Sequence, residues 1–204
     1  RPLMDLKIYR APGFAAAALC SMTLGLGLFG STYLLPLLLE TARGMSPAEV
    51  GLAMAPGGFA MAMMFPIAGR LADRMPARPQ VMIGLGCFAL HAVLITWAEF
   101  SAGFWVIAGI MAFGRMSLAL VMPALSAGGL RLLGESQVAQ GAAALNVGRQ
   151  FGGAVGVAIL AVVLETAEAA LPGQIMEAFA ITLMVMAGFG LTAMFVALRL
   201  PGRV

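Results

Sequence analysis

Six long apolar runs separated by short polar segments constrain the fold of this chain more than any other feature of its sequence. Each run is about 20 residues long, the length that an α-helix needs to cross the hydrocarbon core of a membrane. The chain is 61% hydrophobic and only 10% charged, whereas soluble domains are about 25% charged. The two-residue alternation of a membrane barrel is absent, so the sequence predicts an all-α integral membrane protein with six transmembrane helices.

Turn signals separate the predicted helices. Ser46, Pro47 and Glu49 form a capping-box pattern with proline at the first helical position, which predicts that a helix begins at Pro47. Pro172-Gly173 separates the last two runs. The predicted helices cover about residues 14–39, 47–68, 81–98, 103–127, 140–164 and 175–198. They form one bundle over residues 13–200, between a juxtamembrane segment at 1–12 and a tail at 201–204.

The distribution of charge between the loops predicts the orientation of these helices. Basic residues concentrate in cytoplasmic loops, and nine of them fall on one face of the predicted bundle: Arg1, Lys7, Arg10, Arg70, Arg74, Arg78, Arg131, Arg199 and Arg203. The other face has only Arg43, with the acids Glu40, Glu49, Glu99, Glu165, Glu168 and Glu177. We therefore expect both chain ends to be cytoplasmic. The net charge of +3 is spread over these loops and forms no basic stripe for nucleic acid.

A polar segment, predicted as a turn, joins the second and third apolar runs. Residues 69–74 read Gly-Arg-Leu-Ala-Asp-Arg. This segment resembles the signature loop G-x-L-A-D-R-x-G-R-[RK] of the major facilitator superfamily, which lies on the cytoplasmic side between the second and third helices of each six-helix half. Pro76 stands where the family has a glycine, and only Arg78 remains of the final basic pair.

Four further stretches resemble the 14-helix drug:proton antiporter branch of that superfamily (the EmrB/QacA type). They are TYLLPLLLE at 32–40, GLAMAP at 51–56, LVMPAL at 120–125 and NVGRQFGGAVGVA at 146–158. The resemblance covers nearly the whole chain and corresponds to the C-terminal six helices. It implies a half-bundle of two inverted three-helix repeats, with the first and fourth helices lining a central cavity. The second and fifth would meet the other half, and the third and sixth would lie outside.

Four residues of the polar segment are candidates for a gate: Gly69, Asp73, Arg74 and Arg78. A carboxylate at a cytoplasmic helix end can hold an arginine or the N-terminus of another helix. The family resemblance implies a latch that closes the cytoplasmic side when the transporter faces outward. The alternative is a charged loop that only fixes the orientation of the helices.

Arginines inside the predicted helices are candidates for a cavity. Arg115 falls near the middle of the fourth run, where a charge is costly unless it faces a cavity or a partner. It would contact substrate, pair with the other half, or have a structural role in binding backbone carbonyls or a nearby polar residue. Arg149 and Gln150 fall in the cytoplasmic third of the fifth run, with Asn146 one turn earlier. Arg149 would lie where the two halves meet, or extend along the helix to the membrane surface.

Other side chains have weaker functional interpretations. Phe29 and Tyr33 could line the cavity, although an apolar helix surface explains them as well. His91 is more typical of a hydrogen-bonded packing residue than of a proton carrier. Cys20 and Cys87 lie in apolar runs and are expected to be packed thiols rather than a disulfide.

Several classes of function lack their sequence signals. There is no phosphate-binding loop, no cysteine–histidine–acid cluster at metal spacing and no nucleophile–base pair, so an enzyme is not predicted and no cofactor is expected. The resemblance implies half of a secondary-active efflux transporter in a bacterial inner membrane, coupled to a proton gradient. No acid falls at mid-membrane, so the coupling group would lie in the missing N-terminal half. The expected partners are the lipid bilayer, a small-molecule substrate, and the missing N-terminal helices or a second half-bundle. The start at Arg1 suggests an excerpt. The alternative is a helical membrane scaffold without transport activity.

Overall fold

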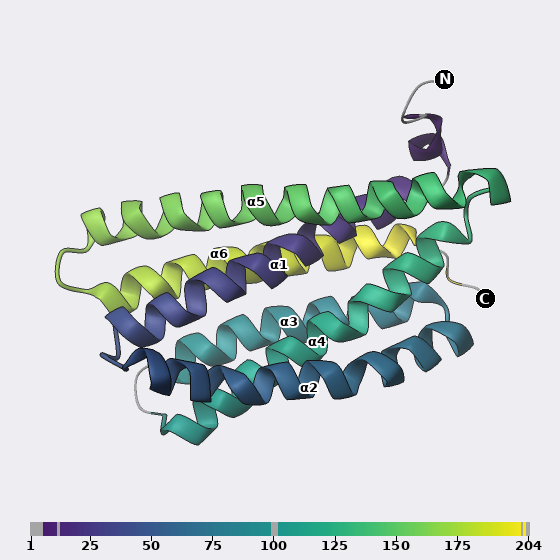
Figure 1. Cartoon of the computed structure of the whole chain (residues 1–204). Coiled ribbons are helices and arrows are strands. Elements are labelled where there is room, and N and C mark those ends of the chain that lie inside the picture. The colour runs from purple at the N-terminus through teal and green to yellow at the C-terminus, as the bar shows by residue number, and fades with distance from the viewer. Residues whose placement is uncertain (1–5, 12, 99–101, 201, 203–204) are drawn as a thin grey trace.

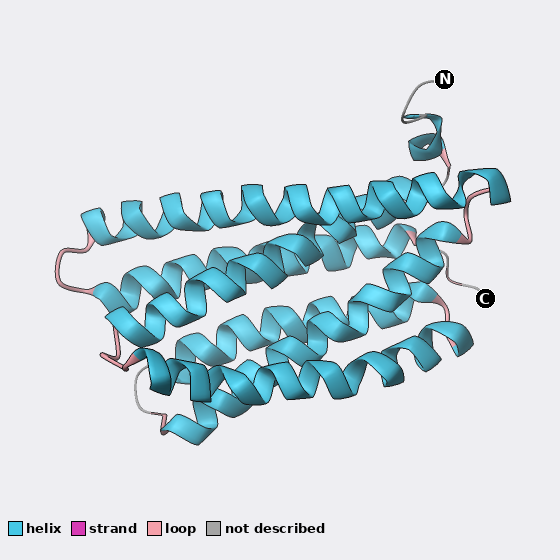
Figure 2. Cartoon of the chain, in the orientation of Figure 1, coloured by secondary structure: helices cyan, strands magenta, loops and turns pink. Residues whose placement is uncertain are grey.

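The computed structural model describes residues 6–11, 13–98, 102–200 and 202, and its described elements are all helices (Figure 2). Six long helices run side by side in alternating directions (Figure 1). Their bounds are α1 Phe14–Thr41, α2 Pro47–Arg74, α3 Ala77–Ala98, α4 Phe104–Leu130, α5 Val138–Ala170 and α6 Ile175–Val196. Short 3-10 helices are η1 Leu6–Arg10, η2 Glu135–Gln137 and η3 Ala197–Arg199. All six long helices are long and apolar enough to cross a membrane, which confirms the predicted number and class.

The packing order follows the expected pair of inverted repeats. The first repeat is α1–α3 and the second is α4–α6. The second helix of each repeat packs mainly against the first helix of the other, α2 on α4 and α5 on α1. Helices α1 and α4 also touch each other in the middle of the bundle, while α3 and α6 pack together behind them (Figure 1). This is the half-bundle that the sequence predicts.

Burial is very uneven between the helices. In the most apolar window of α1, 67% of residues are buried, compared with 17% in α2. The buried residues of α2 form one narrow stripe of mostly small side chains: Val50, Ala53, Gly57, Ala68 and Ala72. The largest fully buried side chains come mainly from α1, α3, α4 and α6. Helices α2 and α5 therefore flank the core and leave most of their surface open.

The segment at residues 69–74 is helical, so its interpretation as a turn is wrong. Helix α2 continues through it to Arg74, because leucine, alanine and arginine are good helix formers whether or not they are apolar. The helix stops at Met75, which is extended (φ −117°, ψ 152°) because Pro76 disfavours helical geometry in the residue before it. Helix α3 then begins at Ala77, so Arg78 belongs to its first turn rather than to a loop.

The other helix bounds agree with the sequence to within a few residues, except for α5. It was expected over residues 140–164 but extends to Ala170, because Glu165–Ala170 contains no helix breaker before Pro172. At 33 residues, α5 is about 50 Å long, more than the hydrocarbon core requires. The additional residues at its C-terminal end include the acids Glu165 and Glu168. The capping box is confirmed: the Ser46 backbone N–H donates to Glu49 Oε2 (2.8 Å), and the Glu49 N–H donates to Ser46 Oγ.

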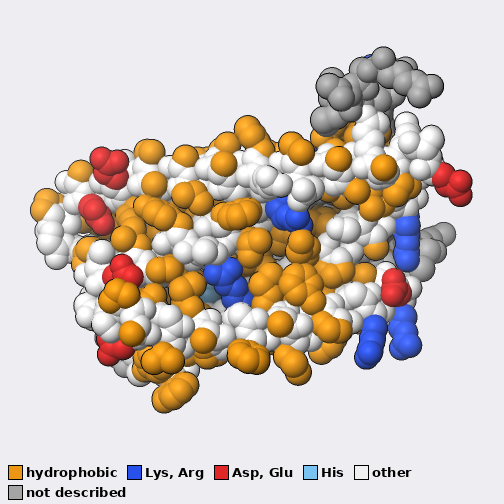
Figure 3. Space-filling model, viewed as in Figure 1, with side chains coloured by type: hydrophobic (Ala, Val, Ile, Leu, Met, Phe, Trp, Pro, Cys, Tyr) orange, Lys and Arg blue, Asp and Glu red, His pale blue; other side chains and the backbone are white. Residues whose placement is uncertain are grey.

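The two ends of the bundle carry opposite charge (Figure 3). Acidic side chains gather at the left end in this view. Most basic side chains gather at the right end, where both chain termini lie in Figure 1, together with two acidic patches. The described basic loops therefore lie at one common end of the bundle, as the sequence predicts. Arg1, Asp5, Glu99 and Arg203 lie outside the described residues, as does most of the predicted tail, and Lys7 is described only in its backbone.

Candidate functional site

One broad face of the bundle is formed by α1, α2, α4 and α5, the helices nearest the viewer in Figure 1. This face is mostly apolar, but two basic patches interrupt it between the charged ends of the molecule (Figure 3). The sequence places two arginines inside these helices away from their ends, Arg115 in α4 and Arg149 in α5. We call this surface the open face. It contains the positions that the sequence predicts for a cavity.

Arg115 lies where three helices meet. Its side chain is half-buried, and its Nη2 donates a hydrogen bond to Thr32 Oγ1 of α1 (2.9 Å). Its stem passes directly over Gly57 of α2, where a Cβ atom would lie 3.0 Å from Arg115 Cγ. Among the described residues, no carboxylate pairs with this guanidinium. The structure therefore holds a cation near the middle of a membrane helix with one neutral acceptor.

Thr32 holds the guanidinium in a fixed direction. The Thr32 hydroxyl donates its own proton to the carbonyl of Leu28 (2.6 Å), so its oxygen is left to accept from Arg115. Neither Thr32 nor Gly57 was singled out from the sequence. A hydroxyl one turn from Phe29 and a glycine in an apolar run are both common in membrane helices, and only the contact with Arg115 distinguishes them.

Arg149 is held by a neighbour on its own helix. Its Nη2 donates to Asn146 Oδ1 (2.6 Å), one turn nearer the basic end of α5. Arg149 and Asn146 line a cavity of about 260 Å³ between α1, α4 and α5, together with Ser21 and Ser126. The structure thus brings these two predicted residues together. The hydrogen bond to Asn146 directs the Arg149 side chain toward the basic end of the bundle, where it borders the cavity.

Phe29 and Gln150 meet at a second hollow between α1 and α5. This hollow has a volume of about 420 Å³ and is completed by Gly153, Ala154 and Val157. A Cβ atom on Gly153 would overlap the Phe29 ring, so the glycine allows the ring to lie against α5. Tyr33 is one turn from Phe29 on α1 and is 37% exposed. Phe29 and Gln150 therefore lie together at the border between α1 and α5, and Tyr33 is one turn further along α1.

The gate candidates are not brought together in the same way. Asp73 and Arg74 are exposed at the end of α2, and no side-chain hydrogen bond or ion pair joins them to another described residue. Gly69 is half-buried with no side chain packed against it, and Arg78 is half-buried in the first turn of α3. The structure places all four at the basic end of the bundle and leaves the partner of Asp73 undefined.

Gln80 is a residue of this region that sequence reasoning missed. It is fully buried, and its Nε2 donates to the carbonyls of Ala68 in α2 (2.9 Å) and Leu120 in α4 (3.0 Å). Its Oε1 has no hydrogen-bond partner among the described residues. A polar amide at the start of an apolar run was the available signal. Gln80 joins three helices directly behind the gate candidates.

His91 has the structural role that its position suggested. It is buried, and its Nδ1 lies 2.9 Å from the carbonyl oxygen of Ile110, which can only accept, so Nδ1 carries the proton of this bond. The ring covers Gly114, where a Cβ atom would lie 2.6 Å from Nδ1. His91 therefore joins α3 to α4 behind Arg115. Cys20 and Cys87 are free, as expected.

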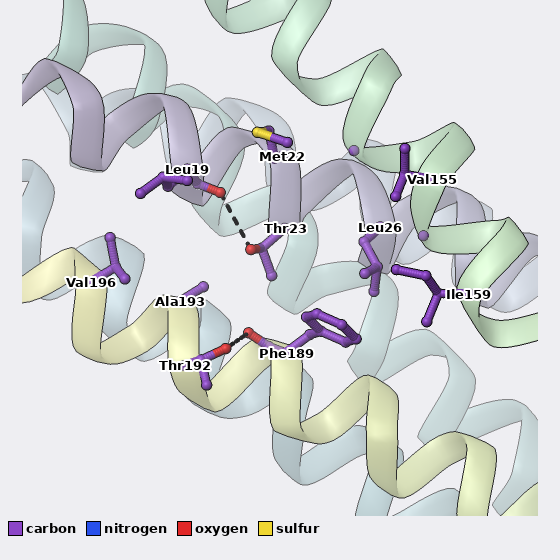
Figure 4. A pocket seen from close by; sticks show the side chains of 12 residues that line it. Leu19, Met22, Thr23, Leu26, Val155, Ile159, Phe189, Thr192, Ala193 and Val196 are labelled. Carbon is purple, nitrogen blue, oxygen red and sulfur yellow. Dashed lines mark hydrogen bonds between the residues drawn. The ribbon is translucent and has the colours of Figure 1, made fainter. Parts of the chain in front are cut away.

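A third cavity opens between α1, α5 and α6 (Figure 4). It has a volume of about 270 Å³ and an almost wholly apolar wall that includes Leu26, Ile159 and Phe189. Its two hydroxyls are satisfied within their own helices, since Thr23 donates to the carbonyl of Leu19 and Thr192 to that of Phe189. The wall offers no free polar group, so the candidate site remains on the open face. Within the described ranges, no cluster of histidine, cysteine and acidic residues could hold a metal ion.

Comparison with known proteins assigns a family to this arrangement. The family model described as Major Facilitator Superfamily matches residues 1–157. Relatives include a methylenomycin A resistance protein of Streptomyces coelicolor, 30% identical over 81% of this chain and 35% of that protein. A multidrug resistance protein B homolog of Mycobacterium tuberculosis is 32% identical over 80% of this chain and 31% of its own length. A lincomycin resistance protein of Listeria innocua is 26% identical over 83% of this chain and 36% of its own length. The chain thus spans about one third of the length of the relatives it matches.

Proposed function

The chain belongs to the major facilitator superfamily, and on that premise we propose that it is the C-terminal half of a secondary-active exporter of small amphipathic molecules, including drugs. Its relatives are named for resistance to methylenomycin A, to lincomycin or to multiple drugs. The transported molecule would cross by alternating access, in which two halves of a bundle expose a site between them to either side of the membrane.

The observation that carries this proposal is the open face with its two arginines. A helical surface that faces only lipid has no use for a charged side chain at mid-depth, because exposing it to hydrocarbon costs several kcal/mol (roughly 3 or more). Arg115 is half-buried, hydrogen-bonded to Thr32 and seated on Gly57. Such placement is typical of a side chain that faces a water-filled cavity. The uncovered surfaces of α2 and α5, which flank it, are available to the rest of the transporter.

Asp73 and its neighbours would form the cytoplasmic gate of this transporter. Their place at the basic end of the bundle supports that role, since basic loops are cytoplasmic in most membrane proteins. Both chain ends would then be cytoplasmic, in a bacterial inner membrane. The partner of Asp73 would come from outside the described residues.

Export would be driven by a proton gradient. A proton-coupled transporter needs a titratable group that is exposed to each side in turn. In this sequence the acids that fall in the helices lie near helix ends: Glu40, Glu49, Asp73, Glu165, Glu168 and Glu177. The coupling carboxylate would therefore come from the remaining helices of the full-length transporter.

Drug efflux by the full-length protein tests the proposal. In drug-hypersensitive bacteria, we expect the full-length protein to raise drug tolerance and Asp73→Asn to lower that gain at least about tenfold, because the latch would lose its charge. Glu135→Gln is the matched control, since Glu135 is also an exposed acid at the basic end and lies outside the gate. It should leave tolerance unchanged.

Two results would overturn parts of this proposal. If the full-length protein moves none of a panel of amphipathic compounds out of cells or vesicles, a scaffold function replaces transport. If Asp73→Asn and Glu135→Gln behave alike at equal expression, Asp73 only sets the orientation of the helices.

A further inference from the structure

We propose that Arg115 receives the oxyanion of the transported molecule, so that the favoured substrates are amphipathic acids rather than amphipathic cations. This inference rests on the proposed function and adds a substrate class to it. It depends on the charge balance of the open face, the free donors of Arg115 and the apolar surface around it.

The charge balance of the open face is one-sided. Away from the helix ends it has two guanidinium groups, Arg115 and Arg149, and no acid falls inside α4. The acids of the other three helices lie within about two turns of a helix end: Glu40, Glu49, Asp73, Glu165 and Glu168. A cavity that selected cations would need a carboxylate or an aromatic cage on this surface, as cation recognition usually does. The open face supplies the opposite charge. It therefore favours anions on electrostatic grounds.

Arg115 has hydrogen-bonding capacity to spare. A guanidinium carries five N–H donors, and the structure uses one side-chain hydrogen bond, from Nη2 to Thr32 Oγ1. Thr32 is itself fixed by its bond to the Leu28 carbonyl, so the guanidinium is anchored at one nitrogen, and its other nitrogens bond to no residue that the structure describes. The planar fork of arginine matches a carboxylate, sulfonate or phosphate with two parallel hydrogen bonds. At mid-depth in the membrane, such a pair is strengthened by the low surrounding polarity.

The surface near Arg115 would hold the apolar body of the same molecule. Phe29, one turn from Thr32 on α1, is 43% exposed, and Met116, beside Arg115 on α4, is 38% exposed. An aromatic ring and a flexible thioether suit varied apolar shapes. A molecule with an apolar body and one acidic group therefore finds both of its parts matched here.

A matched pair of ligands tests the inference. We would titrate the purified full-length transporter with dansyl-labelled undecanoic acid and with its primary amide, which differ only in the charged group, and follow the dansyl fluorescence. The wild-type protein should bind the acid more tightly than the amide. Arg115→Gln should weaken binding of the acid about tenfold, the value of a charge-assisted hydrogen bond, and change binding of the amide less than twofold.

Three further variants make the result specific. Arg115→Lys keeps the charge but loses the fork, so binding of the acid should weaken by a smaller factor. Thr32→Val removes the hydrogen-bond acceptor that anchors the Arg115 guanidinium, so binding of the acid should weaken while binding of the amide stays unchanged. Arg131→Gln removes one positive charge from an exposed residue at the basic end and should change neither ligand. The melting temperature of each variant in detergent shows whether it is folded.

The inference fails if the wild-type protein binds acid and amide equally. It also fails if Arg115→Gln weakens both ligands to the same extent, which is the result expected if Arg115 pairs with a carboxylate from the rest of the transporter. Efflux assays in cells decide the proposed function separately. A protein that exports neutral or cationic compounds without preferring the acid retains the proposed function and loses this inference.

Discussion

The contact of α5 with α1 and the contact of α2 with α4 occupy equivalent places in the two repeats, but they are built differently. Between α5 and α1 the backbones touch: a Cβ atom on Gly152 would lie 2.5 Å from Met22 Cα and 2.6 Å from its carbonyl carbon. Between α2 and α4 the atom nearest to a Cβ on Gly57 would be Arg115 Cγ at 3.0 Å, and the α4 backbone would lie 3.6 Å or more away. The same helix arrangement is thus held by rigid backbone on one side and by a flexible charged side chain on the other.

Because of this difference, we expect the α1–α5 contact to contribute mainly to the stability of the protein and the α2–α4 contact mainly to substrate recognition. A backbone contact cannot adjust to an added atom, whereas the stem of an arginine can rotate to another conformer. We therefore expect α1 and α5 to keep one spacing, and the contact between α2 and α4 to respond to whatever Arg115 binds. The following three predictions test this contrast, from the largest expected effect to the smallest.

Gly152→Ala should have the largest effect. Its Cβ would overlap the Met22 carbonyl oxygen, and neither backbone can move without disturbing the rest of the contact. We expect a loss of at least about 3 kcal/mol in stability, beyond the usual range for overpacking, or no folded protein at all. The measurement is thermal unfolding of the full-length protein in detergent. Gly58→Ala is the control, because nothing lies within 4 Å of its added Cβ; equal melting temperatures for the two variants would refute the backbone contact.

Gln80→Leu should have an intermediate effect on the other contact. It removes the two hydrogen bonds from Nε2 to the carbonyls of Ala68 and Leu120, which tie α2 to α4 through α3. Those carbonyls keep their helical partners and Gln80 Oε1 has none to lose, so we expect a cost of only about 1–2 kcal/mol. The same unfolding assay measures it. Gln137→Leu, at a half-buried residue outside this junction, should leave the melting temperature unchanged, and a similar loss there would contradict the role of Gln80.

Gly57→Ala should have the smallest effect on stability and a distinct effect on binding. The added methyl would lie 3.0 Å from the flexible Arg115 stem and 3.6 Å or more from the backbone of Met111 and Ala112, which is ordinary contact, so we expect a loss below about 1 kcal/mol. The displaced guanidinium should bind the dansyl-labelled acid more weakly and the amide unchanged. If Gly57→Ala destabilises the protein as much as Gly152→Ala does, the two contacts are equally rigid and the contrast disappears.

The sequence was a good guide to the fold because membrane spans depend on long apolar runs, which composition reveals directly. The start of α2 was also predictable, since the Ser46–Glu49 capping box is a local signal. Its end was not: apolarity stops at Ala68, but helix propensity continues to Arg74 and is stopped only by Pro76. Hydropathy indicates where an apolar segment ends, but the helix can continue beyond that point.

The candidate site was predictable only in its charged members. Arg115 and Arg149 stand out because arginine is rare inside apolar runs. Thr32 and Gly57 have no such signal, and the amide of Gln80 at the start of an apolar run is a weak one, because the importance of all three comes from contacts across the bundle. The role of Asp73 stays a prediction for a related reason, since no described residue meets its carboxylate. The sequence shows the chemistry of each side chain, whereas only the folded structure shows which side chains lie close together.

The glycine contact between α1 and α5 has a consequence for how the bundle assembles. In lipid, helices gain no hydrophobic energy by associating, so close packing must favour association. Most packed side chains give up rotamers when they become fixed, at a cost of up to about 2 kcal/mol each, but glycine has none to give up. The contacts at Gly25 and Gly152 therefore combine short backbone distances with almost no loss of side-chain entropy. The association of α1 with α5 therefore has a low entropic cost for the closeness of its contact.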